Sequence, residues 1–119
     1  MRASKNWELE QTQLELLEQI CAGITVLDLD GKIRYYNREA ARILDRKPEY
    51  IGQEVTHCHK KQDTIQRIQE MMVSFREGRQ EPFHWEIERF GRRLLISFSP
   101  LRSGGCLVGC IHMAVVKPS

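Results

Sequence analysis

The spacing of hydrophobic residues predicts two main helices. Over residues 6–20, leucine and isoleucine recur near helical spacing between Glu and Gln, and Asn6 is a candidate N-cap. The apolar stripe of this helix is narrow, so the helix needs a partner surface, either the domain's own sheet or a second copy of the chain. A longer helix is predicted over about residues 61–77, with Gly78 placed to cap its end. Its apolar stripe consists of Ile65, Ile68, Met72 and Phe75, with Met71 beside it.

Residues 22–36 are predicted to form a β-hairpin, and a short helix follows it. Two β-favouring runs flank Asp30-Gly31, a pair typical of tight hairpin turns in which both residues adopt positive φ. Asn37 is predicted to cap the short helix, because its side chain can accept a hydrogen bond from a backbone N–H of the first turn. Pro48 ends this piece and can open another turn.

The second half of the chain predicts three more strands. Residues 82–89 alternate apolar with polar side chains, and so does the next strand, which is predicted to stop near Pro100. Residues 106–116 form a long apolar last strand. The apolar positions of the first two strands are Phe83, Trp85, Ile87, Leu94, Ile96 and Phe98.

This order of elements predicts an α+β fold. We expect a five-stranded antiparallel sheet with helices on one face and an N-terminal flanking helix. Residues 1–21 are assigned to the flanking and dimerisation helix, and residues 22–117 to the domain itself.

Length and charge narrow the class of protein. A chain of 119 residues fits one domain that buries an ordinary core. Its 18 basic and 16 acidic residues are nearly balanced, which argues against a strong electrostatic nucleic-acid binder. The sequence has no apolar run of the roughly 18 residues that suggest a membrane span, and its start lacks an apolar signal core. We therefore expect a cytoplasmic domain that binds neither membrane nor nucleic acid.

The four cysteines are scattered along the chain. Without a secretion signal, the simplest interpretation is four reduced thiols that act as small apolar residues. In a straight strand, Cys106 and Cys110 would lie about 13 Å apart, which is too far for a disulfide or a shared metal. Cys58 raises the alternative of a thiol-based redox switch.

The order of elements and the turn residues together resemble a PAS domain over about residues 14–116. The most recognisable pieces are the run from Ile24 to Asn37 and the Ile51-Gly52 pair shortly after Pro48. The second half is most similar to the PAS modules of bacterial hemerythrin-like proteins, which carry a GxxVxxCH signature before a long helix and a Gly-Lys or Gly-Arg pair at its end. The matching residues here are Gly52, Val55, Cys58, His59 and Gly78-Arg79.

A weaker resemblance concerns the haem-binding PAS domain of carbon-monoxide-responsive transcription regulators, in which a histidine at the place of His59 is an axial ligand. The chain also departs from these patterns. Lys60 stands where the hemerythrin-associated signature usually has proline, and the Asn-Cys-Arg-Phe run of flavin-binding light sensors is absent. We therefore do not predict flavin photochemistry.

The PAS resemblance implies an apolar cavity between the sheet and its helices, where a small ligand can bind. His59 would enter the longer helix at the rim of this cavity, either as a metal ligand or only as a hydrogen-bonding residue at the helix start. The aromatic and aliphatic candidates fit a plain core equally well. The full set of expected pocket residues is His59, Cys58, Met72, Phe83, Trp85, Ile96, Phe98, Ile111 and Met113.

The remaining histidines and Met113 add further alternatives. His57 could share a metal with His59 if that segment is extended. His84 is predicted to face solvent, and His112 to face the outer side of the sheet, because Leu107, Ile111 and Met113 would form the cavity phase of the last strand. Met113 is either a thioether ligand to haem or apolar filler.

These observations favour a bacterial sensory module over an enzyme. No carboxylate pair, phosphate-binding loop or HExxH helix is visible in the sequence, and Cys58 and His59 are too close along the chain to form a nucleophile–base pair. We expect a homodimer that binds a small ligand or a signalling protein and transmits through its N-terminal helix. The alternative is a haem-dependent gas or redox sensor with His59 as axial ligand; otherwise the cofactor is unknown.

Overall fold

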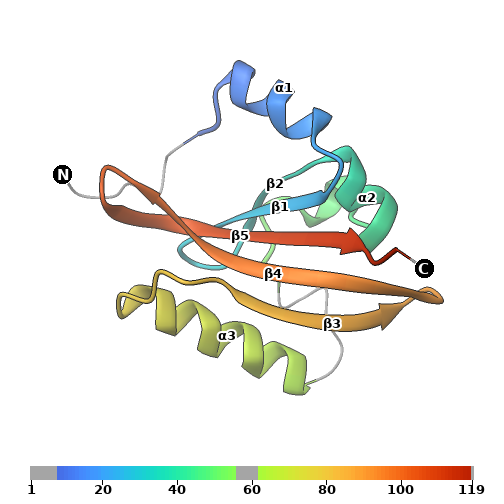
Figure 1. Ribbon diagram of the computed structural model, residues 1–119. Coiled ribbons are helices and arrows are strands. Elements are labelled where there is room, and N and C mark those ends of the chain that lie inside the picture. The colour runs from blue at the N-terminus through green and yellow to red at the C-terminus, as the bar shows by residue number, and fades with distance from the viewer. Residues whose placement is uncertain (1–7, 56–61, 119) are drawn as a thin grey trace.

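The fold is built on a five-stranded antiparallel sheet (Figure 1). The computed structural model describes residues 8–55 and 62–118 of the chain. The elements in chain order are α1 (Gln11–Gln19), β1 (Gly23–Asp28), β2 (Ile33–Tyr36), α2 (Arg38–Leu44), the 3-10 helix η1 (Pro48–Tyr50), α3 (Gln62–Arg76), β3 (Phe83–Arg89), β4 (Arg92–Ser103) and β5 (Cys106–Val116).

The strand order in the sheet is β2-β1-β5-β4-β3, so the last strand lies at the centre between the first and the fourth. Helices α2 and α3 contribute buried side chains to one face, called the inner face here. Helix α1 lies beyond the opposite, outer face (Figure 1). The predicted α+β architecture is confirmed, with helices on one face and a flanking N-terminal helix.

The inner face carries the main core. Strands β3 and β4 turn the six predicted apolar residues inward, and the helices bury their own apolar side chains against them; these six are Phe83, Trp85, Ile87, Leu94, Ile96 and Phe98. Phe75 of α3 meets Phe83 and Phe98 at ring-centroid distances of 5.5 and 5.6 Å. Leu44 of α2 packs in the same cluster as Ile96. Burial of such large side chains is the main term that stabilises the domain.

A bulge in β5 reverses the predicted orientation of that strand's second half. Leu101 of β4 pairs with Gly109, whereas the next residue, Arg102, pairs with Leu107, so Val108 is an extra residue on β5. Leu107 packs on the inner face as predicted, but beyond the bulge the inner positions belong to Cys110, His112 and Ala114.

The prediction that Ile111 and Met113 line the cavity is therefore wrong. Both side chains join the outer cluster beside Leu17 of α1. His112, predicted to face outward, lies on the inner face, where its ring meets Phe98 edge-on at 6.4 Å. A strict alternation counted from Leu107 places these residues on the wrong faces because one extra residue exchanges the two faces of a strand.

The first hairpin turns by a different geometry from the predicted one. Only Gly31 of the Asp30-Gly31 pair has positive φ, at 79°. The Oδ1 atom of Asp28 accepts hydrogen bonds from the backbone N–H groups of Asp30 and Lys32, at 2.9 and 3.0 Å. An aspartate turn of this kind replaces the tighter turn that needs two residues with positive φ.

Several element boundaries also differ from the prediction. Strand β4 continues through Pro100 to Ser103, because a proline that donates no ladder hydrogen bond is tolerated beside a bulge. Helix α1 begins at Gln11, where Glu10 and Gln13 form a capping box, and Asn6 lies outside the described residues. Gly78 ends α3 with a φ of 111°, as expected of a C-terminal glycine.

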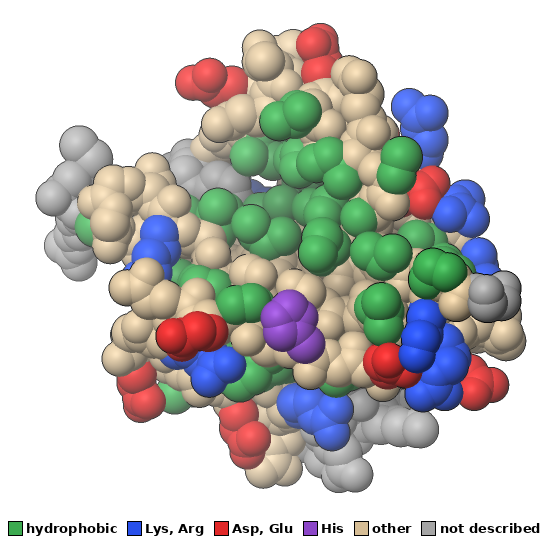
Figure 2. Space-filling model, in the orientation of Figure 1, with side chains coloured by type: hydrophobic (Ala, Val, Ile, Leu, Met, Phe, Trp, Pro, Cys, Tyr) green, Lys and Arg blue, Asp and Glu red, His purple; other side chains and the backbone are tan. Residues whose placement is uncertain are grey.

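The outer face is apolar along β1 and β5 and is only partly covered by α1. Figure 2 shows hydrophobic side chains gathered over these strands below α1. The buried members are Ala22, Ile24 and Val26, and the half-buried ones are Leu17, Tyr35, Leu101, Ile111, Met113 and Val115. Helix α1 buries none of its residues, and Leu16 is 63% exposed. None of the described helices has the length and apolar character that crossing a bilayer requires.

Candidate functional site

A small cavity lies on the inner face between the sheet and the two helices that cover it. Its volume is about 150 Å³. The apolar part of its wall comes from α2, α3, β3 and β4, and the polar part from three arginines and one histidine. The lining residues are Leu44, Arg46, Arg67, Ile68, Trp85, Ile87, Arg89, Ile96, Phe98 and His112.

The predicted pocket residues divide into three groups. Trp85, Ile96 and Phe98 line the cavity. Phe83 lines a neighbouring groove. Met72 is buried in the core beside Gly31, so close that a Cβ added to Gly31 would meet the Cε atom of Met72. Ile111 and Met113 lie on the outer face, as described above.

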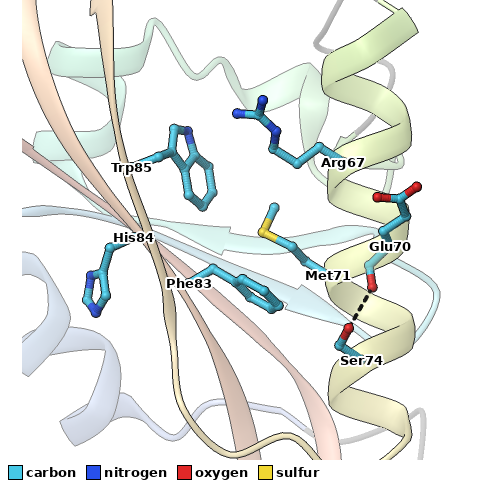
Figure 3. Close-up of a pocket in the computed structure, with 7 residues that line it drawn as sticks. All are labelled: Arg67, Glu70, Met71, Ser74, Phe83, His84 and Trp85. Atoms are coloured by element: carbon cyan, nitrogen blue, oxygen red, sulfur yellow. Dashed lines mark hydrogen bonds between the residues drawn. The ribbon is translucent and has the colours of Figure 1, made fainter.

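The remaining predictions for this region lie outside the described residues or concern exposed side chains. His57, Cys58 and His59 belong to the segment that the structure does not describe, so their proposed roles stay predictions. His84 is exposed on β3, as predicted, and its ring extends away from α3 (Figure 3).

The charged residues of the cavity were missed by sequence reasoning. Arg46 follows the end of α2 and is only 6% exposed. Its Nε donates to Oγ1 of Thr25 at 3.3 Å, a hydrogen bond between two buried side chains. Neither residue belongs to a recognisable motif, and an arginine after a short helix normally suggests a solvated loop. Only the tertiary approach of this loop to β1 brings the guanidinium inside.

One row of residues crosses the inner face at the level of the cavity. In the sheet register, Thr25 of β1 lies opposite His112 of β5, which lies opposite Phe98 of β4. The hydrogen-bonding end of this row is Thr25 with Arg46, and the apolar end is Phe98. The lining of the cavity therefore combines hydrogen-bonding and aromatic side chains, and such a lining can orient a ligand with two unlike ends.

An open groove of about 420 Å³ lies beside the cavity between α3 and β3. Figure 3 shows Arg67 and Met71 extending from α3 toward Trp85 and Phe83 of β3. Arg67 and Trp85 line both the groove and the cavity, so these two side chains separate the enclosed space from the open one.

Asn37 joins α1 to the elements that form the cavity. Its Oδ1 accepts from the backbone N–H groups of Ile24 in β1 and Ala40 in α2, both at 2.9 Å. Its Nδ2 donates to the carbonyl oxygens of Leu17 and Ala22, both at 2.8 Å. The predicted cap is confirmed, and the same buried side chain also holds the end of α1 against the domain.

Glu18 provides a second attachment of α1. Its Oε1 accepts a hydrogen bond of 2.6 Å from the hydroxyl of Tyr35 in β2, and its Oε2 lies 3.7 Å from Nε of Arg38. Burial, the hydrogen bond to Glu18 and the charge of Glu18 all raise the pKa of Tyr35. The hydroxyl therefore stays protonated and continues to donate well above neutral pH.

The described cysteines and acidic residues do not form a metal centre. Within residues 8–55 and 62–118, no group of three or more His, Cys, Asp and Glu gathers around one point. Burial raises the pKa of the Cys110 thiol to about 12, which makes it a poor nucleophile at neutral pH. Cys21 is exposed and Cys106 half-buried.

The inner-face cavity, as the described residues line it, is too small for a haem. A cavity of about 150 Å³ has the size that holds a benzene molecule, and a porphyrin is several times larger. Met113, the proposed thioether ligand, lies on the opposite face of the sheet from this cavity.

Comparison with known proteins agrees with the fold. The model of a PAS domain family matches residues 14–109. A C-terminal domain from Streptococcus mutans is 19% identical, with a TM-score of 0.75, and the match covers 93% of this chain and 87% of that one. The PAS domain of Bordetella pertussis BvgS is 14% identical, with a TM-score of 0.74 and coverage of 92% and 86%.

The PAS domain of histidine kinase ThkA is 26% identical, with a TM-score of 0.60, and the match covers 78% of this chain and 96% of that one. No curated protein sequence matches this chain significantly. The closer likeness to hemerythrin-associated or carbon-monoxide-sensing modules stays a prediction. With a family model that spans most of its length and a sheet and helices arranged as in these structures, the chain belongs to the PAS domain family.

Proposed function

We propose that this chain is a sensory module that binds a small ligand in the inner-face cavity and signals through α1. The observation that carries this proposal is the series of hydrogen bonds from the cavity to α1. Arg46 lines the cavity and bonds to Thr25 of β1. The preceding residue, Ile24, donates its backbone N–H to Asn37, whose side chain holds the Leu17 carbonyl. A ligand that shifts Arg46 would act on an element connected to α1.

The similarity to domains of histidine kinases supports a signalling role. Two of the similar structures are the PAS domain of histidine kinase ThkA and the sensor region of a sensor histidine kinase. PAS domains are in general non-catalytic, which agrees with the absence of catalytic motifs in the sequence. The signalling output would then come from a partner protein. We assign the binding of this partner to α1 and the outer face.

The partner we propose is a second copy of the chain. The outer face exposes an apolar surface beside a helix whose Leu16 has no core to pack in. An apolar patch of this kind marks an interaction site more often than a free surface. Leu16→Glu should therefore weaken self-association at least about tenfold, because it places a charge in the contact.

Gln11→Glu is the matched control for this variant. It adds the same charge to an exposed position of α1 that is already polar. Gln11 and Leu16 are five positions apart in the sequence, which places them about 140° apart around the helix axis. Sedimentation of the full chain and both variants at micromolar concentration tests the partner. Association that is lost in Leu16→Glu and kept in Gln11→Glu supports the proposal, and a wild-type chain that stays monomeric contradicts the homodimer.

Ligand binding and its effect on α1 can be measured together. A thermal-shift screen of small metabolites should give compounds that raise the melting temperature, and hydrogen exchange of the α1 amides should change when they bind. A bound compound that leaves α1 exchange unchanged contradicts transmission through α1. A hit that Trp85→Ala does not weaken contradicts the cavity as the site.

A haem-dependent sensor with His59 as axial ligand is the other function that the sequence raises. The size of the cavity and the outward position of Met113 argue against it. Titration with haemin decides between the two. A sharp Soret band that appears on titration and is absent in His59→Ala would support haem and contradict the small-ligand proposal. A spectrum that stays as broad as that of free haemin would contradict the haem proposal.

A further inference from the structure

Three arginines are the charged residues among the described lining of the cavity. Arg46, Arg67 and Arg89 contribute to the wall, and none of the lining residues is Asp or Glu. The adjoining groove has an acidic lining residue in Glu70, whose Oε1 accepts a hydrogen bond from Gln66 at 3.1 Å. The charged side chains that line the cavity itself are therefore all basic.

Two of these arginines occupy complementary places. Arg46 is buried and fixed by its hydrogen bond to Thr25, so its charge stays inside the domain. Arg67 is exposed at the opening and forms no hydrogen bond or ion pair with any part of the chain that the structure describes. Figure 3 shows its guanidinium directed toward Trp85, which also lines both the groove and the cavity. Arg67 is therefore the arginine placed to meet an incoming ligand, and Arg46 is part of the inner wall.

The apolar part of the wall sets the size and character of the rest of the ligand. A volume of about 150 Å³ is that of an apolar cavity known to bind benzene. Trp85, Ile96 and Phe98 supply apolar and aromatic contacts to the wall of the cavity. A compact apolar group the size of one ring would fill the space.

We infer that the ligand of this module is a small organic carboxylate with a compact apolar body, with Arg67 as the first contact of the carboxylate. The inference rests on the proposed function, because it names the ligand class of the same cavity. Guanidinium groups pair with carboxylates through two parallel hydrogen bonds, and such a bond is stronger in a partly enclosed site. A neutral molecule of the same shape gains only the apolar contacts.

Isothermal titration of the full chain with benzoate and benzamide tests the ligand class. The two probes have nearly the same shape and differ in charge. Benzoate should bind at least about tenfold more tightly than benzamide, corresponding to one charge-assisted hydrogen bond. Equal binding of both probes would overturn the carboxylate assignment while leaving the cavity as a ligand site. No binding of benzoate, benzamide or benzene would instead contradict the cavity as a ligand site.

Variants of Arg67 test whether this side chain binds the carboxylate. Arg67→Leu and Arg67→Gln should each weaken benzoate about tenfold and leave benzamide unchanged, and circular dichroism checks that both fold. Arg42→Leu is the matched control, because it removes the same charge from an exposed position of α2 outside the cavity. Equal loss of benzoate binding in Arg42→Leu would show non-specific attraction and overturn the role of Arg67.

Discussion

The side chain of Asn37 donates a hydrogen bond to the main-chain carbonyl of Leu17, 20 positions earlier in the sequence, at 2.8 Å. The two residues belong to elements that otherwise share few contacts, because α1 buries none of its own side chains. This bond and its companions on Ala22, Ile24 and Ala40 make Asn37 the point at which α1, β1 and α2 meet.

Asn37→Ala should lower the free energy of unfolding by about 3 kcal/mol, because it removes a helix cap and leaves buried backbone groups unsatisfied. Urea unfolding measures the loss. Asn37→Asp is the informative companion, since a carboxylate keeps both acceptor contacts and loses both donor contacts.

In Asn37→Asp, hydrogen exchange of the α1 amides should accelerate while the first turn of α2 stays protected. Equal acceleration in both helices would show that the cap and the attachment of α1 are not separable.

Gly109→Ala should destabilise the domain by about 3 kcal/mol or prevent folding, because a Cβ at this position would overlap the carbonyl oxygen of Leu27 in the neighbouring strand. Gly104→Ala is a suitable control. It also places alanine at a glycine, with a φ of 58°, but in open space, and should cost about 1 kcal/mol. Thermal unfolding of both variants compares the two costs, and similar melting temperatures would contradict the predicted overlap.

The Tyr35–Glu18 contact should make stability fall in alkaline solution. The pKa of Tyr35 is raised on folding above its ordinary value near 10. The folded chain then holds this proton at a pH where the unfolded chain has lost it. The contribution is complete well below the ordinary tyrosine pKa near 10 and is lost as the pH rises through this value toward the folded pKa.

Tyr35→Phe removes the hydroxyl and with it the pH dependence of its contribution. The wild type should therefore lose its stability advantage over Tyr35→Phe gradually as the pH rises from 9 through the ordinary tyrosine pKa near 10. Denaturant titrations at a series of pH values measure it. A difference that stays constant or grows with pH would contradict the role of the hydroxyl.

Cysteine reactivity should follow burial. Cys21 is exposed and should react with an alkylating reagent in the native protein at neutral pH, whereas Cys110 should react only after unfolding, because desolvation holds its pKa near 12. Peptide mass spectrometry of native and unfolded samples reports both sites. Rapid native labelling of Cys110 would show that β5 opens far more readily than a central strand should.

The sequence predicted the arrangement of the elements well because their patterns are local. The alternation in β3, the apolar stripe of α3 and the cap at Asn37 each depend on residues close together in the chain. The outline of the sheet follows from these elements and their turns.

The polar part of the candidate site could not be predicted in this way. The burial of Arg46 depends on Thr25 of a distant strand, and the contribution of Arg67 and Trp85 to both groove and cavity depends on how α3 approaches β3. Alternation predicted the inward orientation of Trp85, Ile96 and Phe98, since β3 and β4 pair without a register shift over these residues. It failed for Ile111 and Met113, which follow the bulge in β5.

The extra residue at Val108 determines which side chains of β5 lie on the inner face and which lie on the outer face. A chain shortened by this one residue would exchange the faces of β5 on one side of the deletion, either at Leu107 or along the run that contains Ile111, His112 and Met113. A deletion in this strand would therefore alter two properties at the same time, the lining of the inner face and the apolar surface of the outer face. Relatives that differ in length here should differ in both properties together.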